Sequence, residues 1–330
     1  MVLHTRLTEM LGISVPVVQG GMQWVGVPQM VAAVSNAGGL GILTAFSQPN
    51  PEALRETIKE TRRLTDKPFG VNITFLPAIN PPDYGAFVRA AIEEDVRIFE
   101  TAGNNPGPVI EYLKQNAAIV LHKCTTIRHA KSAIKMGVDV LSIDGFECAG
   151  HPGEEDIGGV VLLARAAQEL NVPYIASGGF ADGRGLAAAL ALGADGVNLG
   201  TRFLATVEAP IHQNIKEVLV KSTERDTIHI FRTLGNTARV YKNAVAKEVV
   251  RLERRPGGAN FEDLRELVKG ERGRKVYTEG DVDAGIWTAG IAVGLINDIP
   301  PCKELLDRMV REAEEIIGKM DSLRKPKAKL

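Results

Sequence analysis

The stretch Ile119–Asp144, IVLHKCTTIRHAKSAIKMGVDVLSID, holds one complete unit of strand, helix and strand. Two apolar runs, Ile119–Cys124 and Val138–Asp144, flank the amphipathic segment Ile127–Met136. Near-continuous apolar runs are typical of parallel strands that are covered on both faces. Gly137 follows the helical segment, where a glycine suits a left-handed C-cap. The stretch therefore predicts two parallel strands joined by a helix.

The same unit recurs through the first 205 residues. Apolar runs predict eight strands, at residues 15–19, 41–46, 69–75, 96–101, 119–124, 138–144, 172–177 and 196–200. Connecting helices are expected between them, for example at residues 51–64, 84–94, 127–136 and 157–170. Asn171 and Gly193 repeat the C-cap signal of Gly137. Eight such units predict an α/β fold, the (β/α)8 TIM barrel.

A six-stranded doubly wound sheet is the alternative to the barrel. That fold carries its glycine fingerprint between the first strand and the following helix. Here the cluster Gly38-Gly39-Leu40-Gly41 precedes a strand instead. The position of these glycines disfavours a dinucleotide-binding sheet.

The alternation stops after the eighth strand. Residues 209–290, called the insert below, are predicted to be mostly helical, with helices at 209–221, 237–254 and 261–269. The barrel domain then comprises residues 1–208 and 291–330, with its final helix at 302–318. We expect the insert to cover the mouth of the barrel as a substrate-binding lid. The basic residues 323–330 are expected to be a solvated tail.

The composition excludes several kinds of partner. The 330 residues carry 39 basic and 40 acidic side chains, so no global field favours nucleic acid or an anionic membrane. The N-terminus lacks the apolar core of a signal peptide, and no run approaches the ~20 apolar residues of a membrane span. We therefore expect a soluble, cytoplasmic protein that acts on a small molecule. The oligomeric state stays open, a homodimer included.

Three cysteines, Cys124, Cys148 and Cys302, allow neither a disulfide framework nor a zinc site of ordinary spacing. Cys124 and Cys302 are predicted to be small buried hydrophobes. Cys148 lies close to His151, so a thiolate nucleophile is an alternative there. No second ligand stands at metal spacing from His151, and no metal site is expected.

In a (β/α)8 barrel the ends of all strands meet at one face, and polar residues concentrate at the predicted ends. The most informative are two glycine turns after strands seven and eight, where barrels commonly bind phosphate on backbone N–H groups. They contain Ser177, Gly178, Gly179, Gly200 and Thr201. Tight turns without a ligand are the simpler alternative for each loop alone, but two such loops together favour a phosphate site.

Lys123 and His151 are the candidate functional side chains of strands five and six. A lone lysine in an apolar run requires a negative ligand or a carboxylate partner, and a salt bridge with Asp144 is the simpler of the two interpretations. Both can hold. His151 stands on a glycine-bearing loop before Pro152, where it meets a ligand or serves as a hydrogen-bonding structural residue.

Seven motifs, taken in order, resemble the FMN-dependent nitronate monooxygenase family, formerly called 2-nitropropane dioxygenases. They are Gly20-Gly21-Met22, Gly70-Val71-Asn72, His122-Lys123-Cys124, Ser142-Ile143-Asp144-Gly145, Ala149-Gly150-His151, Ala176-Ser177-Gly178-Gly179 and Leu199-Gly200-Thr201-Arg202-Phe203. The resemblance implies non-covalent FMN with its phosphate on the loops after strands seven and eight. It assigns His151 as the catalytic residue and the cofactor contacts to Met22, Gln23, Asn72, Lys123, Asp144, Ala149, Gly150, Ser177, Gly178, Gly179, Gly200 and Thr201.

Finer motifs are more similar to a bacterial branch of NADH:quinone reductases within that family. They are the runs 21–26, 144–154 and 285–290. Pro152 and Trp287 stand where the nitronate-oxidising members carry other residues. This similarity implies that NADH or NADPH gives a hydride to flavin N5 and that a quinone then takes the electrons, with Lys123 balancing charge on the ring.

Three other functions remain as alternatives at this point. A nitronate monooxygenase would use O2 as acceptor and His151 as base. A phosphate-binding isomerase or aldolase would need no flavin, and a phospholigand-binding barrel would have no activity at all. Trp24 and Trp287 either shape the substrate face or belong to the core.

Overall fold

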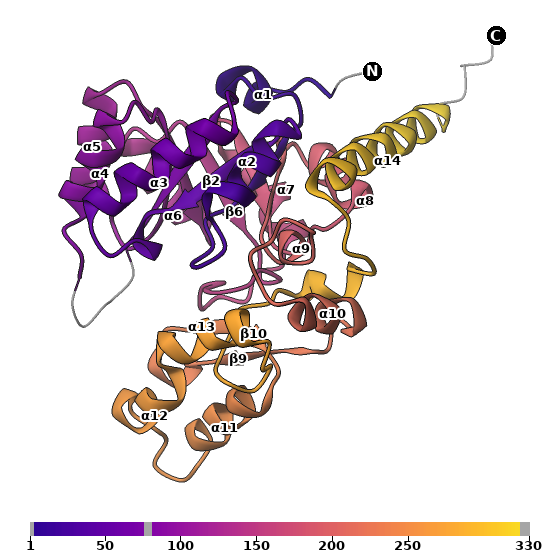
Figure 1. Ribbon diagram of the computed structural model, residues 1–330. Helices are drawn as coiled ribbons and strands as arrows, with labels where there is room; N and C mark the ends of the chain where they lie inside the picture. Colours follow the sequence, from indigo (N-terminus) through magenta and orange to yellow (C-terminus); the bar gives the residue numbers. More distant parts are fainter. Residues whose placement is uncertain (1–2, 76–80, 324–330) are drawn as a thin grey trace, which may run out of the picture.

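The computed structural model describes residues 3–75 and 81–323, and eight parallel strands close into a barrel (Figure 1). Each strand pairs with the next, and β1 pairs with β8 to complete the ring. The strands are β1 (Val17–Gln19), β2 (Leu40–Thr44), β3 (Phe69–Phe75), β4 (Ile98–Gly103), β5 (Ile119–Cys124), β6 (Val140–Asp144), β7 (Tyr174–Ser177) and β8 (Val197–Leu199). The predicted (β/α)8 fold is confirmed, and every strand lies within two residues of its predicted bounds.

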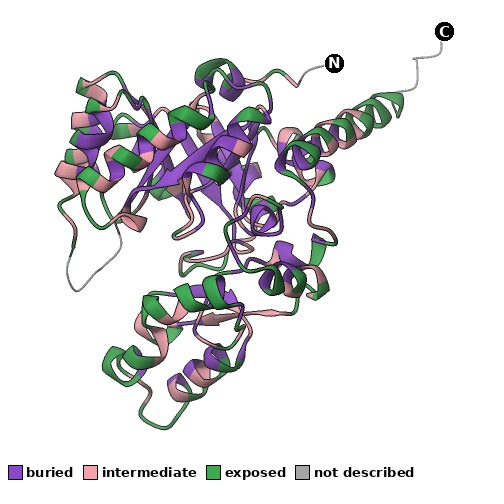
Figure 2. Ribbon diagram, in the orientation of Figure 1, coloured by how far each residue is buried: buried purple, intermediate pink, exposed green. Residues whose placement is uncertain are grey.

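Helices follow the strands, and most of them cover the outside of the barrel. They are α2 (Pro28–Asn36), η1 (Ala45–Ser47), α3 (Pro51–Leu64), α4 (Tyr84–Glu93), α5 (Gly107–Gln115), α6 (Ile127–Lys135), α7 (Gly159–Glu169), α8 (Gly183–Ala191), α9 (Thr201–Leu204) and α14 (Cys302–Ser322). Asn50, Thr126 and Asp182 cap the starts of α3, α6 and α8 through their side chains. Figure 2 shows buried strands surrounded by helices whose outer faces are exposed.

The C-cap predictions hold at two positions and fail at the third. Gly137 and Gly193 adopt the left-handed conformation, with φ of 93° and 87°. The prediction for Asn171 is wrong, because α7 ends in an extended Leu170 with φ −110° and ψ 139°. An extended residue leaves the helix directly and makes a left-handed residue unnecessary.

The interior of the barrel changes from apolar to polar along its axis. Side chains of a strand alternate between the two faces of the sheet, so residues two apart share a face. Ile98, Leu121 and Val140 belong to one buried interior cluster. Two residues further along each strand stand Glu100, Lys123 and Ser142. The carboxyl end of the barrel is therefore polar inside, and the amino end is an apolar plug.

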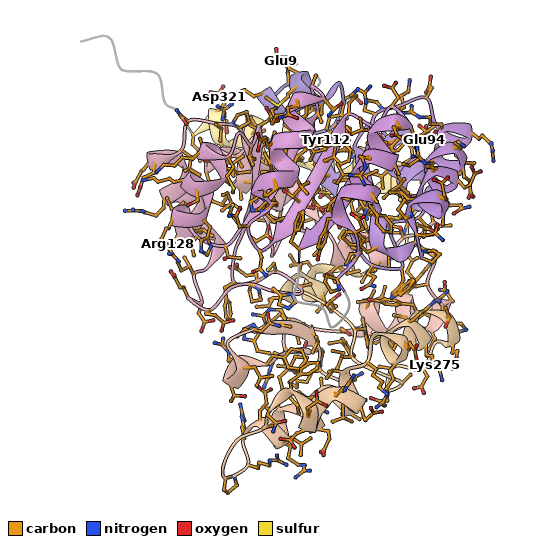
Figure 3. The ribbon with its side chains drawn as sticks, turned by 90° about the vertical axis from the view of Figure 1, so that its left-hand side faces the viewer. Glu9, Glu94, Tyr112, Arg128, Lys275 and Asp321 are labelled. Carbon is orange, nitrogen blue, oxygen red and sulfur yellow. The ribbon has the colours of Figure 1, made fainter. Side chains whose placement is uncertain are left out.

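The short helix α1 (Arg6–Leu11) closes the amino end. Leu7 and Leu11 join the apolar interior cluster of the barrel. Arg6 holds the helix in place, because its Nη2 lies 2.7 Å from Oδ2 of Asp195, which precedes β8. Figure 3 shows Glu9 of α1 and Lys275 of the insert on opposite sides of the barrel.

The insert differs from its prediction mainly in a hairpin, of which neither strand was expected. The helix predicted at 237–254 is wrong over its first residues, which form strand β10 (Ala238–Tyr241) of an antiparallel hairpin with β9 (Thr227–Ile230). The helix α11 (Ala244–Glu253) begins after Asn243, whose side chain accepts the N–H of Ala246. The alternating Ala238-Arg239-Val240-Tyr241 places two apolar residues on one face, and strand packing outweighed the helical pattern.

The remaining elements of the insert are helical. They are α10 (Gln213–Lys221), η2 (Arg232–Leu234), α12 (Phe261–Val268) and α13 (Gly270–Glu279), and η3 (Ile291–Leu295) follows them. Ile230, Val240, Val249 and Leu264 form a small hydrophobic cluster separate from the barrel core. In Figure 1 this group lies beyond the barrel on the side opposite to α1.

No helix within the described ranges is both long and apolar enough to cross a bilayer. The final barrel helix extends four residues beyond its predicted end and packs against α8 and α2. Of the predicted basic tail, residues 324–330 lie outside the described residues.

Truncation of Leu7 tests the plug at the amino end. Leu7 is fully buried, so Leu7→Ala should lower the free energy of unfolding by about 2–5 kcal/mol through lost burial and a residual cavity. Met10→Ala on the same helix is the control, because Met10 is 38% exposed and its truncation should cost less than about 1 kcal/mol. Urea unfolding measures both values, and equal losses would contradict the plug.

Candidate active site

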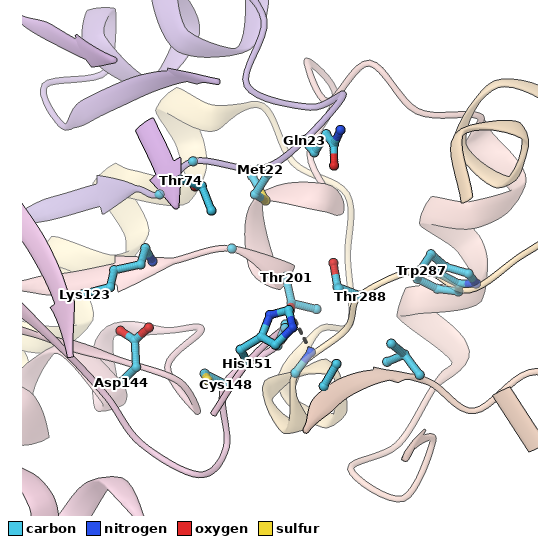
Figure 4. A pocket seen from close by; sticks show the side chains of 18 of the residues that line it. Met22, Gln23, Thr74, Lys123, Asp144, Cys148, His151, Thr201, Trp287 and Thr288 are labelled. Carbon is cyan, nitrogen blue, oxygen red and sulfur yellow. Dashed lines mark hydrogen bonds between the residues drawn. The ribbon is translucent and has the colours of Figure 1, made fainter. Parts of the chain in front are cut away.

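A cavity of about 620 Å³ lies between the carboxyl ends of the strands and the insert. Side chains of both parts line it (Figure 4). In that view Lys123 and Asp144 lie on one side, Trp287 on the other, and His151 and Thr201 between them. The lining includes every residue that the sequence nominated: Met22, Gln23, Asn72, Lys123, Asp144, Ala149, Gly150, His151, Ser177, Gly178, Gly179, Gly200 and Thr201.

Lys123 forms its ion pair with a residue that sequence reasoning did not assign. Its Nζ lies 3.5 Å from Oε1 of Glu100, and the predicted salt bridge with Asp144 is not the one formed. Asp144 instead accepts a hydrogen bond of 2.9 Å from Ser142 Oγ. Register places Lys123 between the two carboxylates, because Glu100 is paired with Leu121 on one side and Asp144 lies two residues beyond Ser142, the partner of Lys123, on the other. The ammonium contacts Glu100. A lone carboxylate two residues after Ile98 was the available signal for Glu100.

The charges around Lys123 perturb one another. Burial acts to lower the pKa of Lys123, but the carboxylates of Glu100 and Asp144 outweigh it and raise that pKa, so the side chain stays an ammonium. Burial raises the pKa of Asp144, while Lys123 and two serine hydroxyls limit the rise. The cavity thus presents one permanent positive charge beside a carboxylate.

The glycine turns after β7 and β8 face the cavity. Gly178 and Gly179 have φ of +85° and +87°, and a Cβ on Gly178 would lie 2.7 Å from the backbone nitrogen of Cys148. A side chain is therefore excluded at Gly178 by both strain and space. Gly200 is open, because a Cβ there would meet only Sδ of Met22, at 3.7 Å. Backbone can approach a ligand closely at Gly200, which fits the predicted phosphate loop.

These observations test whether a flavin mononucleotide fits the residues present. The glycine turns offer backbone for a phosphate, with free space at Gly200, and Lys123 offers a cation for an electron-rich ring edge. Asn72 is 3% exposed and adds a side-chain amide in the same cavity. This combination of donors matches an anionic ligand with a polar ring, so the residues fit the group.

The loop that carries His151, residues 145–153, is attached to the insert through Arg239. Arg239 and Gly150 exchange two backbone hydrogen bonds, of 2.6 and 3.1 Å. The Arg239 guanidinium donates to the Phe146 carbonyl at 2.9 Å and lies 4.6 Å from the centroid of its ring. Sequence reasoning missed Arg239 because it placed this residue in a helix. The insert therefore helps to hold the candidate catalytic loop.

His151 borders the open cavity, yet protein atoms surround it on the other sides. Burial lowers the pKa of His151, and the carboxylate of Glu154 opposes this only in part. The imidazole is therefore neutral near pH 7, with one nitrogen that donates and one that accepts. Such a ring can hydrogen-bond a ligand or take a proton from it.

Cys148 does not fit the thiolate alternative. Burial and the nearby Asp144 carboxylate raise its pKa, so the thiol stays protonated. Cys124 and Cys302 are buried free thiols, as predicted. Burial raises the pKa of Cys302 to about 12.

Both tryptophans line the cavity, but they are held differently. Trp287 is 3% exposed and stacks on Tyr241 with 4.3 Å between ring centroids. It therefore belongs to the hydrophobic core and also lines the cavity. Trp24 has a φ of +68°, and the Arg274 guanidinium of the insert lies 4.6 Å from its ring centroid. Burial raises the pKa of the neighbouring Tyr277 to about 12, which keeps its phenol protonated.

A (β/α)8 barrel with glycine turns and a half-buried ammonium at its carboxyl mouth is the architecture of a cofactor-binding barrel enzyme. The chain belongs to the nitronate monooxygenase family, whose sequence profile matches residues 4–312. It is thus an enzyme of that oxidoreductase family, whose members depend on flavin.

Individual relatives span nearly the full length of the chain. FabK from Thermotoga maritima is 37% identical in sequence, and its structure superimposes with a TM-score of 0.90 over 97% of this chain and 99% of that one. A (3aS,4S,5R,7aS)-5-hydroxy-7a-methyl-1-oxo-octahydro-1H-indene-4-carboxyl-CoA dehydrogenase of Rhodococcus jostii (strain RHA1) is 33% identical over 98% of this chain and 99% of its own. A nitronate monooxygenase of Paraburkholderia phytofirmans is 29% identical over 95% and 96%.

Removal of the Arg239 side chain should loosen the loop at residues 145–153. Arg239→Ala deletes the hydrogen bond to Phe146 and the contact with its ring, worth about 1–3 kcal/mol to the loop. Amide hydrogen exchange in peptides of this loop should then become about 5- to 100-fold faster. Arg251→Ala is the control, because Arg251 pairs with Glu248 on the exposed face of α11. Unchanged exchange in Arg239→Ala would show that the backbone bridge alone holds the loop.

His122 should make stability depend on pH. Burial lowers the pKa of His122 to about 4, against a slight opposing effect of Glu100, and its Nδ1 lies 2.7 Å from Thr101 Oγ1. The unfolded chain, with a pKa near 6.5, binds more protons between pH 6.5 and 4. Stability is therefore lost as the pH falls through this window, by on the order of 3 kcal/mol from this group.

The variant His122→Asn should flatten that pH dependence, whatever its stability at pH 7. Urea unfolding at pH 7, 6, 5 and 4 gives the slope for each protein. His4→Asn serves as control, because His4 is exposed on the surface. Parallel curves for the wild type and His122→Asn would contradict the assignment.

Proposed function

We propose that the protein is an FMN-dependent NAD(P)H:quinone reductase. One observation carries the proposal: a half-buried ammonium, two glycine turns and a neutral histidine line a single cavity at the carboxyl mouth of the barrel. The family supports a flavin oxidoreductase, and the motifs around Pro152 and Trp287 favour the quinone reductase branch.

A bound FMN would supply a ring atom, N5, that accepts a hydride from NADH or NADPH and from which the electrons pass to a quinone. The backbone at Ser177, Gly178, Gly179, Gly200 and Thr201 would hold its phosphate. Lys123 and Asn72 would meet the polar edge of the ring, and Met22, Gln23, Asp144, Ala149 and Gly150 would contact its remaining surface.

His151 acts on the acceptor in this proposal. A neutral imidazole can donate its N–H to a quinone oxygen and deliver a proton as that oxygen gains electrons. The cavity admits water to the exposed His151 ring, which can then recover the proton. Lys123 keeps its charge throughout and favours the development of negative charge near it.

The walls supplied by the insert suit a flat apolar acceptor. Val240, Ile286 and Trp287 line the outer part of the cavity together with Tyr277. A nicotinamide and a quinone are both flat rings that can enter the same space in turn, so no separate dinucleotide-binding fold is required. The insert is thus proposed to be the substrate-binding lid.

A nitronate monooxygenase is the second candidate. The neutral His151 can equally accept a proton from a carbon acid, and the relative from Paraburkholderia phytofirmans carries that activity in its name. The Rhodococcus jostii relative is named for a CoA thioester, so an acyl-CoA is also worth testing as a substrate.

Anaerobic stopped-flow reduction separates these functions. The yellow protein, loaded with FMN, is mixed in parallel with NADH, NADPH, propionate 3-nitronate and an acyl-CoA. We expect bleaching by a reduced nicotinamide and reoxidation by benzoquinone. Bleaching by the nitronate alone would establish the second candidate, and a colourless protein that fails to bind FMN would refute both.

His151→Ala should reduce quinone turnover about 10²- to 10⁴-fold, because the acceptor loses its proton donor. Bleaching by NADH should change far less, since hydride transfer needs no proton from His151. His129→Ala, on the exposed face of α6, is the control. Equal turnover in all three proteins would remove His151 from the mechanism.

A further inference from the structure

Glu100 is a buried carboxylate directly behind the cavity wall. It lies on β4, is 1% exposed and points into the barrel. Its Oε2 accepts the N–H of Gly21 at 2.9 Å and Nδ2 of Asn72 at 2.7 Å. Its Oε1 lies 3.4 Å from Nδ2 of Asn198 and 3.5 Å from Nζ of Lys123. One side chain therefore ties together residues from four other parts of the barrel mouth.

All four of these donors line the cavity. Among the described residues, Gly21, Asn72, Lys123 and Asn198 border it, whereas Glu100 is behind them. A buried charge costs several kcal/mol to desolvate, and a well-packed apolar replacement for a buried ion pair is often as stable. Stability alone is therefore a weak explanation for a carboxylate at this position. Its hydrogen bonds and ion pair with four groups that line the cavity are a more specific explanation.

The contacts determine how the lining groups are presented. The Asn72 amide donates to Glu100 and accepts a hydrogen bond of 2.8 Å from Thr74 Oγ1, so its orientation is determined. The bond from Gly21 fixes the backbone directly before Met22 and Gln23. A Cβ on Gly21 would lie 2.4 Å from Cγ of Asn72, so no larger residue can enter between them.

We propose that Glu100 is a positioning residue that orients Asn72, Lys123 and the Gly21 loop toward the bound FMN and sets the net charge they present to it. The inference rests on the proposed function for the identity of the ligand. The contacts of Glu100 themselves do not depend on it.

Three groups face the Lys123 ammonium: Glu100 from β4, Asp144 at the end of β6, and the protonated thiol of Cys148 from the following loop. Glu100 is the larger of the two carboxylate influences that raise the pKa of Lys123. Without its charge, burial would be opposed by Asp144 alone. The neutral amine would then form at a lower pH, and at pH 7 the remaining ammonium would be less neutralised.

The variant Glu100→Gln tests this in the protein without FMN. Pulse acetylation at pH 7 to 10, followed by peptide mass spectrometry, compares modification of Lys123 with that of the exposed Lys247 in the same molecule. We expect at least a tenfold increase in relative modification of Lys123 at pH 8. Glu93→Gln, which removes the same charge from the exposed end of α4, should leave the ratio unchanged.

The FMN-loaded variant supplies a second readout. Loss of the Glu100 charge should shift the reduction potential of bound FMN to a more positive value, because negative charge on the ring is stabilised better. A purely structural role would weaken FMN binding but would move neither the acetylation profile nor the potential. Wild-type values for both quantities in Glu100→Gln would overturn the proposal.

Glu100→Asp keeps the charge and shortens its reach, and it decides the matter if Glu100→Gln does not fold. It should retain the wild-type acetylation profile and reduction potential while it binds FMN at least tenfold more weakly; a shifted profile or potential, or wild-type FMN affinity, would overturn the proposal. If the wild type binds FMN but NADH and NADPH fail to bleach it, the proposed function is wrong. The acetylation profile, measured without FMN, would still test the effect of Glu100 on Lys123.

Discussion

Alternation of side chains along short parallel strands is the constraint on which the site depends. A strand that crosses a closed barrel has only a few inward positions, spaced two residues apart. In this chain the first of these positions is apolar and the next is polar, as with Ile98 and Glu100 or Leu121 and Lys123. The apolar positions fill the barrel together with α1, and the polar ones meet at the mouth. A one-residue shift in any strand would turn its functional side chain toward the helices.

The insert turns this polar mouth into an enclosed cavity. Its own small hydrophobic cluster lets the hairpin β9–β10 present side chains without drawing on the barrel core. Arg239 uses that hairpin to hold the backbone on both sides of Cys148, at Phe146 and Gly150. The candidate catalytic loop is thus supported by the barrel at its start and by the insert further along.

The sequence sufficed for the barrel because near-continuous apolar strands and amphipathic helices each have a clear period. It also sufficed to nominate barrel residues that line the cavity, since strand ends of a parallel barrel must meet, but not the lining residues of the insert such as Val240 and Ile286. It failed where partners come from different strands. Lys123 pairs with Glu100 although Asp144 stands on the other neighbouring strand at the same offset, so the choice depends on side-chain packing between strands, and no local pattern carries that information. The hairpin in the insert was missed because Thr237–Arg254 also satisfies a helical pattern, and only packing against Val249 and Leu264 decides the matter.

The cavity has a floor and walls of separate origin. Asn72, Lys123 and Asp144 belong to strands whose neighbours leave little freedom to change. Val240, Val268 and Ile286 belong to the insert, whose core is small and separate. Substitutions in the walls can therefore alter which molecule is admitted while the chemistry of the floor is inherited unchanged. Such a division permits relatives of one chain to bear names as different as a nitronate monooxygenase and an octahydro-indene carboxyl-CoA dehydrogenase.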